Sequence, residues 1–160
     1  MPHTLFISDL HLSATHPRSS ELFLQFAKNI TPQAEALYIL GDLFEYWAGD
    51  DDLDDPFHHT IAATLRKLSE QGTRIFLMHG NRDFAIGPQF AAAAGASLLP
   101  DPFDLVLPEW SFVLSHGDAL CLDDPDYTAY RAKVRNPAWL QKMLARPRFF
   151  RRQLGRYIRW

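Results

Sequence analysis

Cysteine is nearly absent from this sequence, since Cys121 is the only one among 160 residues. One thiol cannot form an internal disulfide, and it leaves a metal site built only from cysteines without enough ligands. The sequence also lacks the glycine pattern of a phosphate loop and the histidine pair of a zinc-protease helix, so neither of those catalytic routes has support.

Long hydrophobic runs are missing as well. Residues 84–100 carry no charge, but Gly87, Pro88 and Gly95 interrupt them, which argues against a membrane span. The first residues lack a basic start followed by an apolar stretch, so we expect no signal peptide and a cytoplasmic location. With 47% hydrophobic and 22% charged residues, the composition predicts one globular domain and argues against a disordered, collagenous or coiled-coil chain.

Acidic residues are absent from the last 30 positions. Residues 131–160 hold ten of the 16 basic residues, so the first 130 hold six basic against 19 acidic residues, a balance of −13. An acidic body suits a divalent-cation site, whereas a basic, aromatic-rich tail suits phosphate, a membrane surface or nucleic acid. The alternative for the tail is a solvated helical face.

Short apolar runs alternate with segments of helical spacing. We expect strands over 4–8, 36–40, 74–78 and 97–99, a hairpin of 105–107 with 111–115, and helices over 19–30, 58–71 and 88–94 and after residues 124, 136 and 147. Ser19 or Ser20 is the expected cap of the first helix, and the last helix should be basic and amphipathic. This alternation predicts an α/β fold with a mainly parallel sheet, in which sites gather at the carboxyl ends of strands.

Polar residues follow four of the predicted strands: Asp9 and His11, then Asp42, then Asn81, then His116. If residues 9–11 are extended, Asp9 and His11 point to the same side. Asp42 could bridge two cations, one also bound by Asp9 and His11 and the other by Asn81 and His116. Two such ions can activate water and neutralise a phosphoryl group, and this mixture of ligands suits Mn²⁺ or a similar ion.

Each of these residues also has an ordinary structural explanation. Asp9 could cap a helix, Asp42 could be a turn residue, and His116 could be a hydrogen-bonded core histidine. A nucleophilic Asp9 in aspartyl-phosphate chemistry is a further alternative, but His11 stands where a second acid would be expected.

The order of these motifs resembles the calcineurin-like metallophosphoesterases. The resemblance rests on Asp9-Leu10-His11, Gly41-Asp42, Gly80-Asn81-Arg82-Asp83 and His116-Gly117-Asp118. That family usually has histidine where this chain has Arg82. Together with 40–45, Trp47, 49–52 and 120–124, this substitution makes the whole chain look like the UDP-2,3-diacylglucosamine diphosphatases of lipid A biosynthesis.

The resemblance implies the N-terminal part of a four-layer αββα sandwich, with residues 1–124 as its core and 125–160 as the start of a basic helical lid. It implies a peripheral enzyme on the cytoplasmic face of the inner membrane. Such an enzyme hydrolyses the pyrophosphate of UDP-2,3-diacylglucosamine to UMP and 2,3-diacylglucosamine 1-phosphate.

The resemblance also implies roles for individual residues. Two Mn²⁺ ions would be bound by Asp9, His11 and Asp42, and by Asp42, Asn81 and His116. The substrate would contact Asn81, Arg82, Asp124 and Tyr127. A guanidinium at Arg82 can form charge-assisted hydrogen bonds to phosphate oxygens. The alternative for Arg82 is a surface ion pair with Asp83 or Asp118.

The family continues past Trp160 to a Gly-His-x-His segment that completes both metal sites, and this sequence has none. We therefore expect an incomplete chain with impaired activity, a second sheet that is largely missing, and self-association through exposed apolar surface. The alternative function is an inactive phosphate- or nucleic-acid-binding module that uses the basic tail. That alternative leaves the acidic clusters unexplained.

Overall fold

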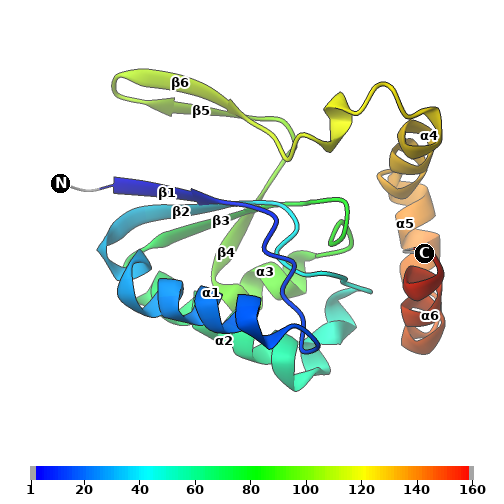
Figure 1. Ribbon diagram of the computed structural model, residues 1–160, viewed down its shortest axis with the longest axis horizontal. Coiled ribbons are helices and arrows are strands. Elements are labelled where there is room, and N and C mark those ends of the chain that lie inside the picture. The colour runs from blue at the N-terminus through cyan, green and yellow to red at the C-terminus, as the bar shows by residue number, and fades with distance from the viewer. Residues whose placement is uncertain (1–2, 159–160) are drawn as a thin grey trace.

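A parallel sheet of four strands forms the centre of the computed structural model, which describes residues 3–158 and side chains as far as Gly155. The strands lie in the order β1 (His3–Ile7), β2 (Ala34–Leu40), β3 (Arg74–Met78) and β4 (Ala96–Leu99). Three helices pack on one face of this sheet: α1 (Pro17–Asn29), α2 (Pro56–Glu70) and α3 (Pro88–Ala94) (Figure 1). The predicted α/β fold with a parallel sheet is confirmed.

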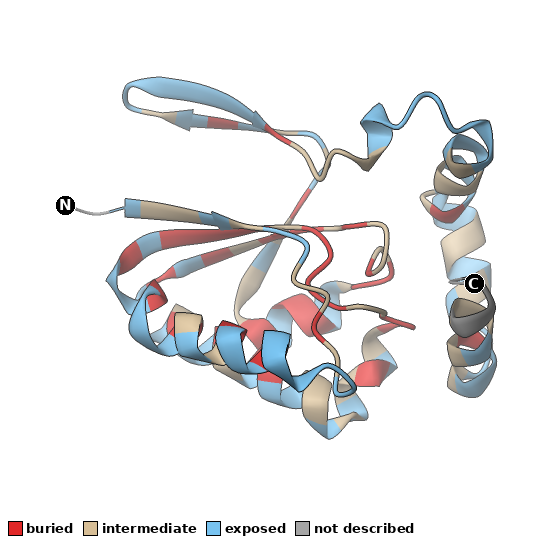
Figure 2. Ribbon diagram, in the orientation of Figure 1, coloured by how far each residue is buried: buried red, intermediate tan, exposed pale blue. Residues whose placement is uncertain are grey.

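The main core lies between this sheet and its helices. Leu37 and Ile39 of β2 are fully buried, and they pack with Phe23 of α1 and with Ile61 and Leu65 of α2. Figure 2 shows the buried positions of α1 and α2 on the side that faces the sheet. Apolar residues at helical spacing in the helices and a continuous apolar run in β2 account for this packing.

Two helices begin earlier than their sequence pattern predicts. α1 starts at Pro17, and Ser20 is buried with its hydroxyl donating to the carbonyl of Ser13, so neither predicted serine caps the helix. α2 starts at Pro56 rather than at His58, because Asp55 accepts the N–H of Phe57 as an N-cap. In both helices the first turn contains a proline that lies before the apolar residues at helical spacing, so the apolar pattern alone places the start too late.

The opposite face of the sheet is covered by a hairpin of β5 (Phe103–Leu107) and β6 (Trp110–Leu114) (Figure 1). Leu105 and Leu114 pack there with Tyr38 and Met78 of the sheet. Within the described part of the chain this second layer has two strands, and the predicted hairpin is confirmed. Several large apolar side chains of the hairpin remain exposed: Val106, Trp110, Phe112 and Val113.

Three helices form a column at one end of the molecule, beside the loops that follow the strands (Figure 1). They are α4 (Pro125–Val134), α5 (Pro137–Leu144) and α6 (Arg148–Ile158). Asp124 and Asn136 cap the first two through their side chains. Arg159 and Trp160 of the expected lid lie outside the described residues. None of the helices described between residues 3 and 158 has the length and apolar character needed to span a bilayer.

Three short 3₁₀ turns complete the structure: η1 (Thr31–Gln33), η2 (Asp50–Asp54) and η3 (Asp118–Leu120). The turn η2 lies on the chain between the loop after β2 and α2, and it carries much of the negative charge of the body.

Candidate metal centre

The loops after β1, β2, β3 and β6 converge on the side chain of Asp42, which is 2% exposed. The Nε2 atoms of His11 and His116 lie 3.7 and 3.8 Å from Asp42 Oδ2. Asp9, Asp42 and His116 each place one donor atom within 4.8 Å of the others. In the orientation that satisfies its hydrogen bonds, the Asn81 amide donates to Asp42 Oδ2 at 2.7 Å. The structure thus gathers all five residues predicted to bind metal.

The backbone is strained at three of these residues. Asp9, His11 and Asp42 have φ values of 55°, 49° and 53°, in the left-handed region. Non-glycine residues rarely adopt it, and such conformations cost about 1–3 kcal/mol each and concentrate at functional sites. Residues 9–11 therefore turn rather than extend, and the expectation of an extended segment is wrong. Position 80 must be a glycine for a different reason, because a Cβ atom there would overlap the side chain of Asp42.

Both histidines present Nε2 to Asp42. Nδ1 of His116 lies 2.9 Å from the carbonyl oxygen of Leu40. A carbonyl only accepts, so Nδ1 carries a proton and Nε2 is the nitrogen that faces Asp42. Nδ1 of His11 lies 2.9 Å from Glu45 Oε2, at ion-pair distance. An imidazole whose Nε2 is held in a fixed direction is suited to binding a metal ion.

The charge balance at Asp42 fits a bound cation. Burial raises the pKa of the Asp42 carboxyl, while the N–H of Arg82 and the two histidines oppose that rise. Among the side chains described as far as Gly155, no lysine or arginine forms an ion pair with Asp42 within 4 Å. Carboxylates, imidazoles and an amide match the ligands of Mn²⁺ and similar divalent ions. The residues therefore fit a divalent cation, and the division into two ligand sets stays a prediction.

A cavity of about 570 Å³ opens beside Asn81 and Arg82, between the loop after β2 and the lid helices. Its polar end also carries Asp124 and Tyr127. Its remaining wall is mainly apolar and aromatic and includes Tyr46, Trp47, Phe84, Tyr130, Trp139, Leu140, Met143, Leu144 and Leu154. A cavity with a polar end and an apolar wall can hold an amphipathic ligand.

The four predicted substrate residues all line this cavity, but two have structural partners. Asp124 accepts the N–H of Tyr127 as the cap of α4. The hydroxyl of Tyr127 donates to Asp118 Oδ2 at 3.0 Å. Burial and the Asp118 carboxylate raise the pKa of Tyr127.

Arg82 is one-third exposed, and its Nη1 lies 3.9 Å from Glu45 Oε1. The alternative pairing of Arg82 with Asp83 or Asp118 is wrong. Asp83 accepts backbone N–H groups, and Asp118 pairs with Arg131 and Arg135 of α4.

The family model described as calcineurin-like phosphoesterase matches residues 2–151. The chain belongs to this family. Curated relatives named UDP-2,3-diacylglucosamine hydrolase are similar to it over almost its full length. The protein from Cellvibrio japonicus is 47% identical over 98% of this chain, and that from Azotobacter vinelandii is 50% identical over 96%. The chain spans 65% and 63% of the lengths of these two proteins.

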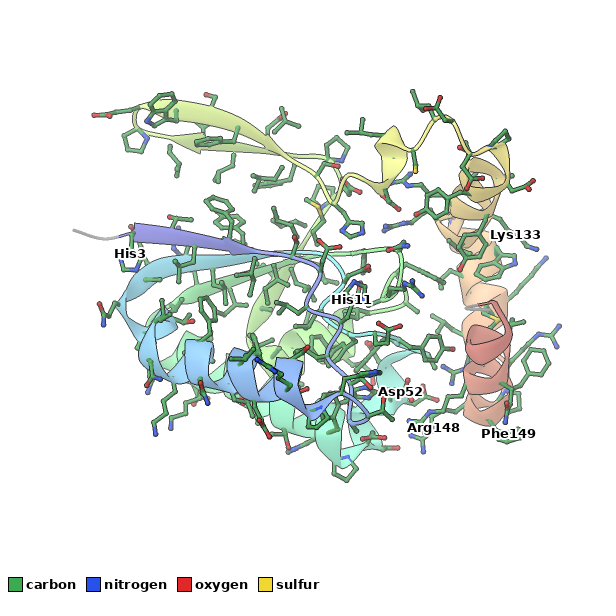
Figure 3. The ribbon with its side chains drawn as sticks, in the orientation of Figure 1. His3, His11, Asp52, Lys133, Arg148 and Phe149 are labelled. Carbon is green, nitrogen blue, oxygen red and sulfur yellow. The ribbon has the colours of Figure 1, made fainter. Side chains whose placement is uncertain are left out.

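Within this calcineurin-like chain, ion pairs fasten α6, part of the expected lid, to the core. Arg151 is buried and pairs with the carboxylate of Asp51, and it also donates to the carbonyl of Ala48. We call the following set the lid latch: Asp51, Asp52, Asp54, Arg148, Arg151 and Arg152. Figure 3 shows Arg148 extending from α6 toward the turn that carries Asp52, while Phe149 points away.

The lid latch changes the interpretation of the two charged segments. Of the eight basic tail residues whose side chains the structure describes, five pair with aspartates: Arg131, Arg135, Arg148, Arg151 and Arg152. Six of the 19 acidic residues of the body therefore balance charge on the tail: Asp51, Asp52, Asp54, Asp55, Asp101 and Asp118. Sequence reasoning missed this pairing, although a run of aspartates at 50–55 opposite an acid-free tail was a signal for it.

Two glycines permit the close contact between lid and core. Gly49 has a φ of 137°, and a Cβ there would overlap the guanidinium of Arg151. A Cβ on Gly155 of α6 would overlap the ring of Tyr46, whose hydroxyl donates to the carbonyl of Arg151 at 2.6 Å.

Proposed function

We propose that this chain is the metal-binding and lid-bearing part of an enzyme that hydrolyses UDP-2,3-diacylglucosamine to UMP and 2,3-diacylglucosamine 1-phosphate. The observation that carries the proposal is the position of the apolar cavity, which opens directly beside Asn81 and Arg82 at the candidate metal centre. A pyrophosphate held at the polar end would leave the acyl chains within reach of the lid.

The cofactor in this proposal is a pair of Mn²⁺ ions. Asp9, His11 and Asp42 would hold one, and Asp42, Asn81 and His116 the other. Bound divalent ions supply Lewis-acid activation of water and neutralise charge on the phosphoryl group.

The residues of this chain have three further tasks in the reaction. Arg82 donates hydrogen bonds to phosphate oxygens and so holds the phosphate group in the site. The side chains of Trp139, Leu140 and Met143 exclude water and bind acyl chains through apolar contact. A cavity of about 570 Å³ is of a size that holds a drug-sized group, so it would take part of the lipid and leave the uridine outside.

The enzyme proposal is tested by product analysis. The 160-residue chain, and the same chain extended with the C-terminal third of the Cellvibrio japonicus relative, are incubated with UDP-2,3-diacylglucosamine and Mn²⁺. Mass spectrometry should detect UMP and the acylated sugar phosphate in an EDTA-sensitive reaction, faster in the extended chain. No product from either protein would contradict the proposal.

The binding module that uses the basic tail is the weaker candidate, because five of the basic residues described in the tail already pair with aspartates. Titration with single-stranded DNA distinguishes the binding module from the enzyme. Binding that falls steeply with salt and ignores EDTA would favour the module.

We also propose peripheral attachment to the cytoplasmic face of the inner membrane and self-association through the β5–β6 hairpin. Leu120, Leu122 and Phe149 are exposed apolar residues near the two ends of the lid, and Val106 and Val113 are exposed on the hairpin. Co-sedimentation with anionic phospholipid vesicles tests the first proposal, and light scattering over a concentration series tests the second.

A further inference from the structure

We propose that Glu45 is a positioning residue of the metal centre, which orients His11 with one carboxylate oxygen and Arg82 with the other. The inference rests on the metal centre of the proposed function. Oε2 of Glu45 lies 2.9 Å from His11 Nδ1, and Oε1 lies 3.9 Å from Arg82 Nη1. A single side chain thus contacts a predicted metal ligand and the predicted phosphate-binding residue.

The backbone holds Glu45 in this position. The segment after β2 runs parallel to the segment after β1, with a β-bridge between Leu12 and Phe44. The N–H of Glu45 donates to the carbonyl of Leu12 at 3.1 Å, and the N–H of His11 donates to the carbonyl of Asp42 at 3.0 Å. These hydrogen bonds fix the two loops side by side, so the backbone already places Glu45 next to His11.

The two histidines of the centre have similar surroundings, although the Nδ1 of His116 makes a hydrogen bond and the Nδ1 of His11 lies at ion-pair distance from its carboxylate. Each places Nε2 near Asp42, and each has its Nδ1 next to an oxygen. For His116 that oxygen is the carbonyl of Leu40, whereas for His11 it is the carboxylate of Glu45. A carboxylate beside the second ring nitrogen fixes the ring orientation and raises the basicity of the nitrogen that binds metal. Loss of such a partner typically lowers metal affinity about 10 to 100-fold.

The second carboxylate oxygen of Glu45, Oε1, faces the guanidinium of Arg82. Arg82 is one-third exposed and has a long, flexible side chain. The Glu45 carboxylate attracts its guanidinium toward the metal centre and away from solvent. Glu45 therefore connects the two parts of the site that act on the substrate.

Calorimetric titration with Mn²⁺ tests this role. Glu45→Gln keeps the shape of the side chain and removes its charge. We expect the affinity of one Mn²⁺ to fall about 10 to 100-fold, with the other ion bound nearly as in the wild type. Glu45→Asp keeps the charge but withdraws the carboxylate, and should give an intermediate loss. The matched control is Glu35→Gln, which removes an exposed ion pair with Arg74 and should leave Mn²⁺ binding unchanged.

A double-mutant cycle distinguishes positioning from a general structural effect. If Glu45 acts through His11, adding Glu45→Gln to His11→Ala should cause no further loss of Mn²⁺ affinity. Additive losses, or wild-type binding by Glu45→Gln, would overturn the inference. A wild-type chain that binds no Mn²⁺ would instead overturn the metal centre and the proposed function with it.

Discussion

Asp83 accepts a hydrogen bond from the backbone N–H of Leu43 at 2.8 Å, which fastens the loop after β3 to the loop after β2. The same carboxylate accepts the N–H of Gly80 at 2.8 Å and that of Asp42 at 3.3 Å, and its side chain is fully buried. One aspartate therefore fixes the backbone on both sides of Asp42, the central residue of the candidate metal centre.

The first prediction is that Asp83→Ala destabilises the fold by about 3 kcal/mol, because each buried N–H left without an acceptor costs about 1–3 kcal/mol. Urea denaturation followed by circular dichroism measures the change. Asp104→Ala, at an exposed position of β5, is the control and should shift the free energy of unfolding little. Equal urea midpoints for the two variants would contradict the organising role of Asp83.

The second prediction compares two carboxylates of the metal centre. Asp42 lies between both histidines, whereas Asp9 belongs to one predicted ligand set. Asp42→Ala should therefore abolish measurable Mn²⁺ binding at both sites, and Asp9→Ala should weaken one. Calorimetry gives the stoichiometry and affinity. Unchanged binding by Asp42→Ala would show that the centre is not dinuclear.

The third prediction concerns Arg82. Arg82→Ala should lower kcat/KM of the extended chain about 100-fold, the scale of losing one donor to a developing charge, with metal content near normal. Arg82→Lys keeps the charge but not the planar pair of donors, so it should recover only part of the activity. If Arg82→Ala instead loses metal, and the metal-loaded fraction has normal kinetics, then Arg82 helps to hold the metal ions and does not act on the phosphate.

The fourth prediction tests the lid latch. Arg151→Ala removes a buried guanidinium and leaves the carbonyl of Ala48 without its partner, so we expect a loss of about 1–3 kcal/mol in unfolding free energy. Tryptophan fluorescence during urea denaturation reports it. Arg18→Ala on the exposed start of α1 is the control. If both variants unfold alike, α6 owes its position to apolar contacts alone.

The fifth prediction is a pH dependence of the lid latch. Burial alone would raise the pKa of Asp51, but the hydrogen bond and charge of Arg151 outweigh it and lower the pKa below its ordinary 3.8. A lowered pKa in the folded state means that the stabilisation is present above pH 3.8 and is lost as pH falls through the folded-state value. The stability difference between the wild type and Asp51→Asn should shrink below pH 3.8. In an Arg151→Ala background this dependence should disappear.

The sequence was sufficient to predict the parallel sheet and the set of residues around Asp42. Continuous apolar runs mark the strands, and polar residues directly after β1, β2 and β3 meet at one edge of the parallel sheet. His116 follows β6 of the antiparallel hairpin, so its position at Asp42 does not follow from the parallel sheet. The boundaries of α1 and α2 were less predictable, because first-turn prolines lie outside the apolar periodicity. Glu45 was hidden as well. Its role depends on the loop after β2 lying beside the loop after β1, and the spacing of residues along the chain does not reveal that these two loops are neighbours.

The lid presented a different problem. Ten basic residues in one tail suggest phosphate, a membrane surface or nucleic acid as the partner, because composition reports charge and not the group that neutralises it. Only the three-dimensional arrangement reveals that Arg151 and Arg152 lie against Asp51 and Asp52.

The lid latch also has a kinetic consequence, since its partners are far apart in sequence. Arg151 and Asp51 are separated by 100 residues, while the strands and helices of the sheet form between near neighbours in the chain. Closing so long a loop costs entropy before the ion pairs return any free energy. The core should therefore form first, and the outer wall of the cavity should close last. A nascent chain would then complete the loops of the candidate metal centre before it acquires the cavity proposed to hold lipid.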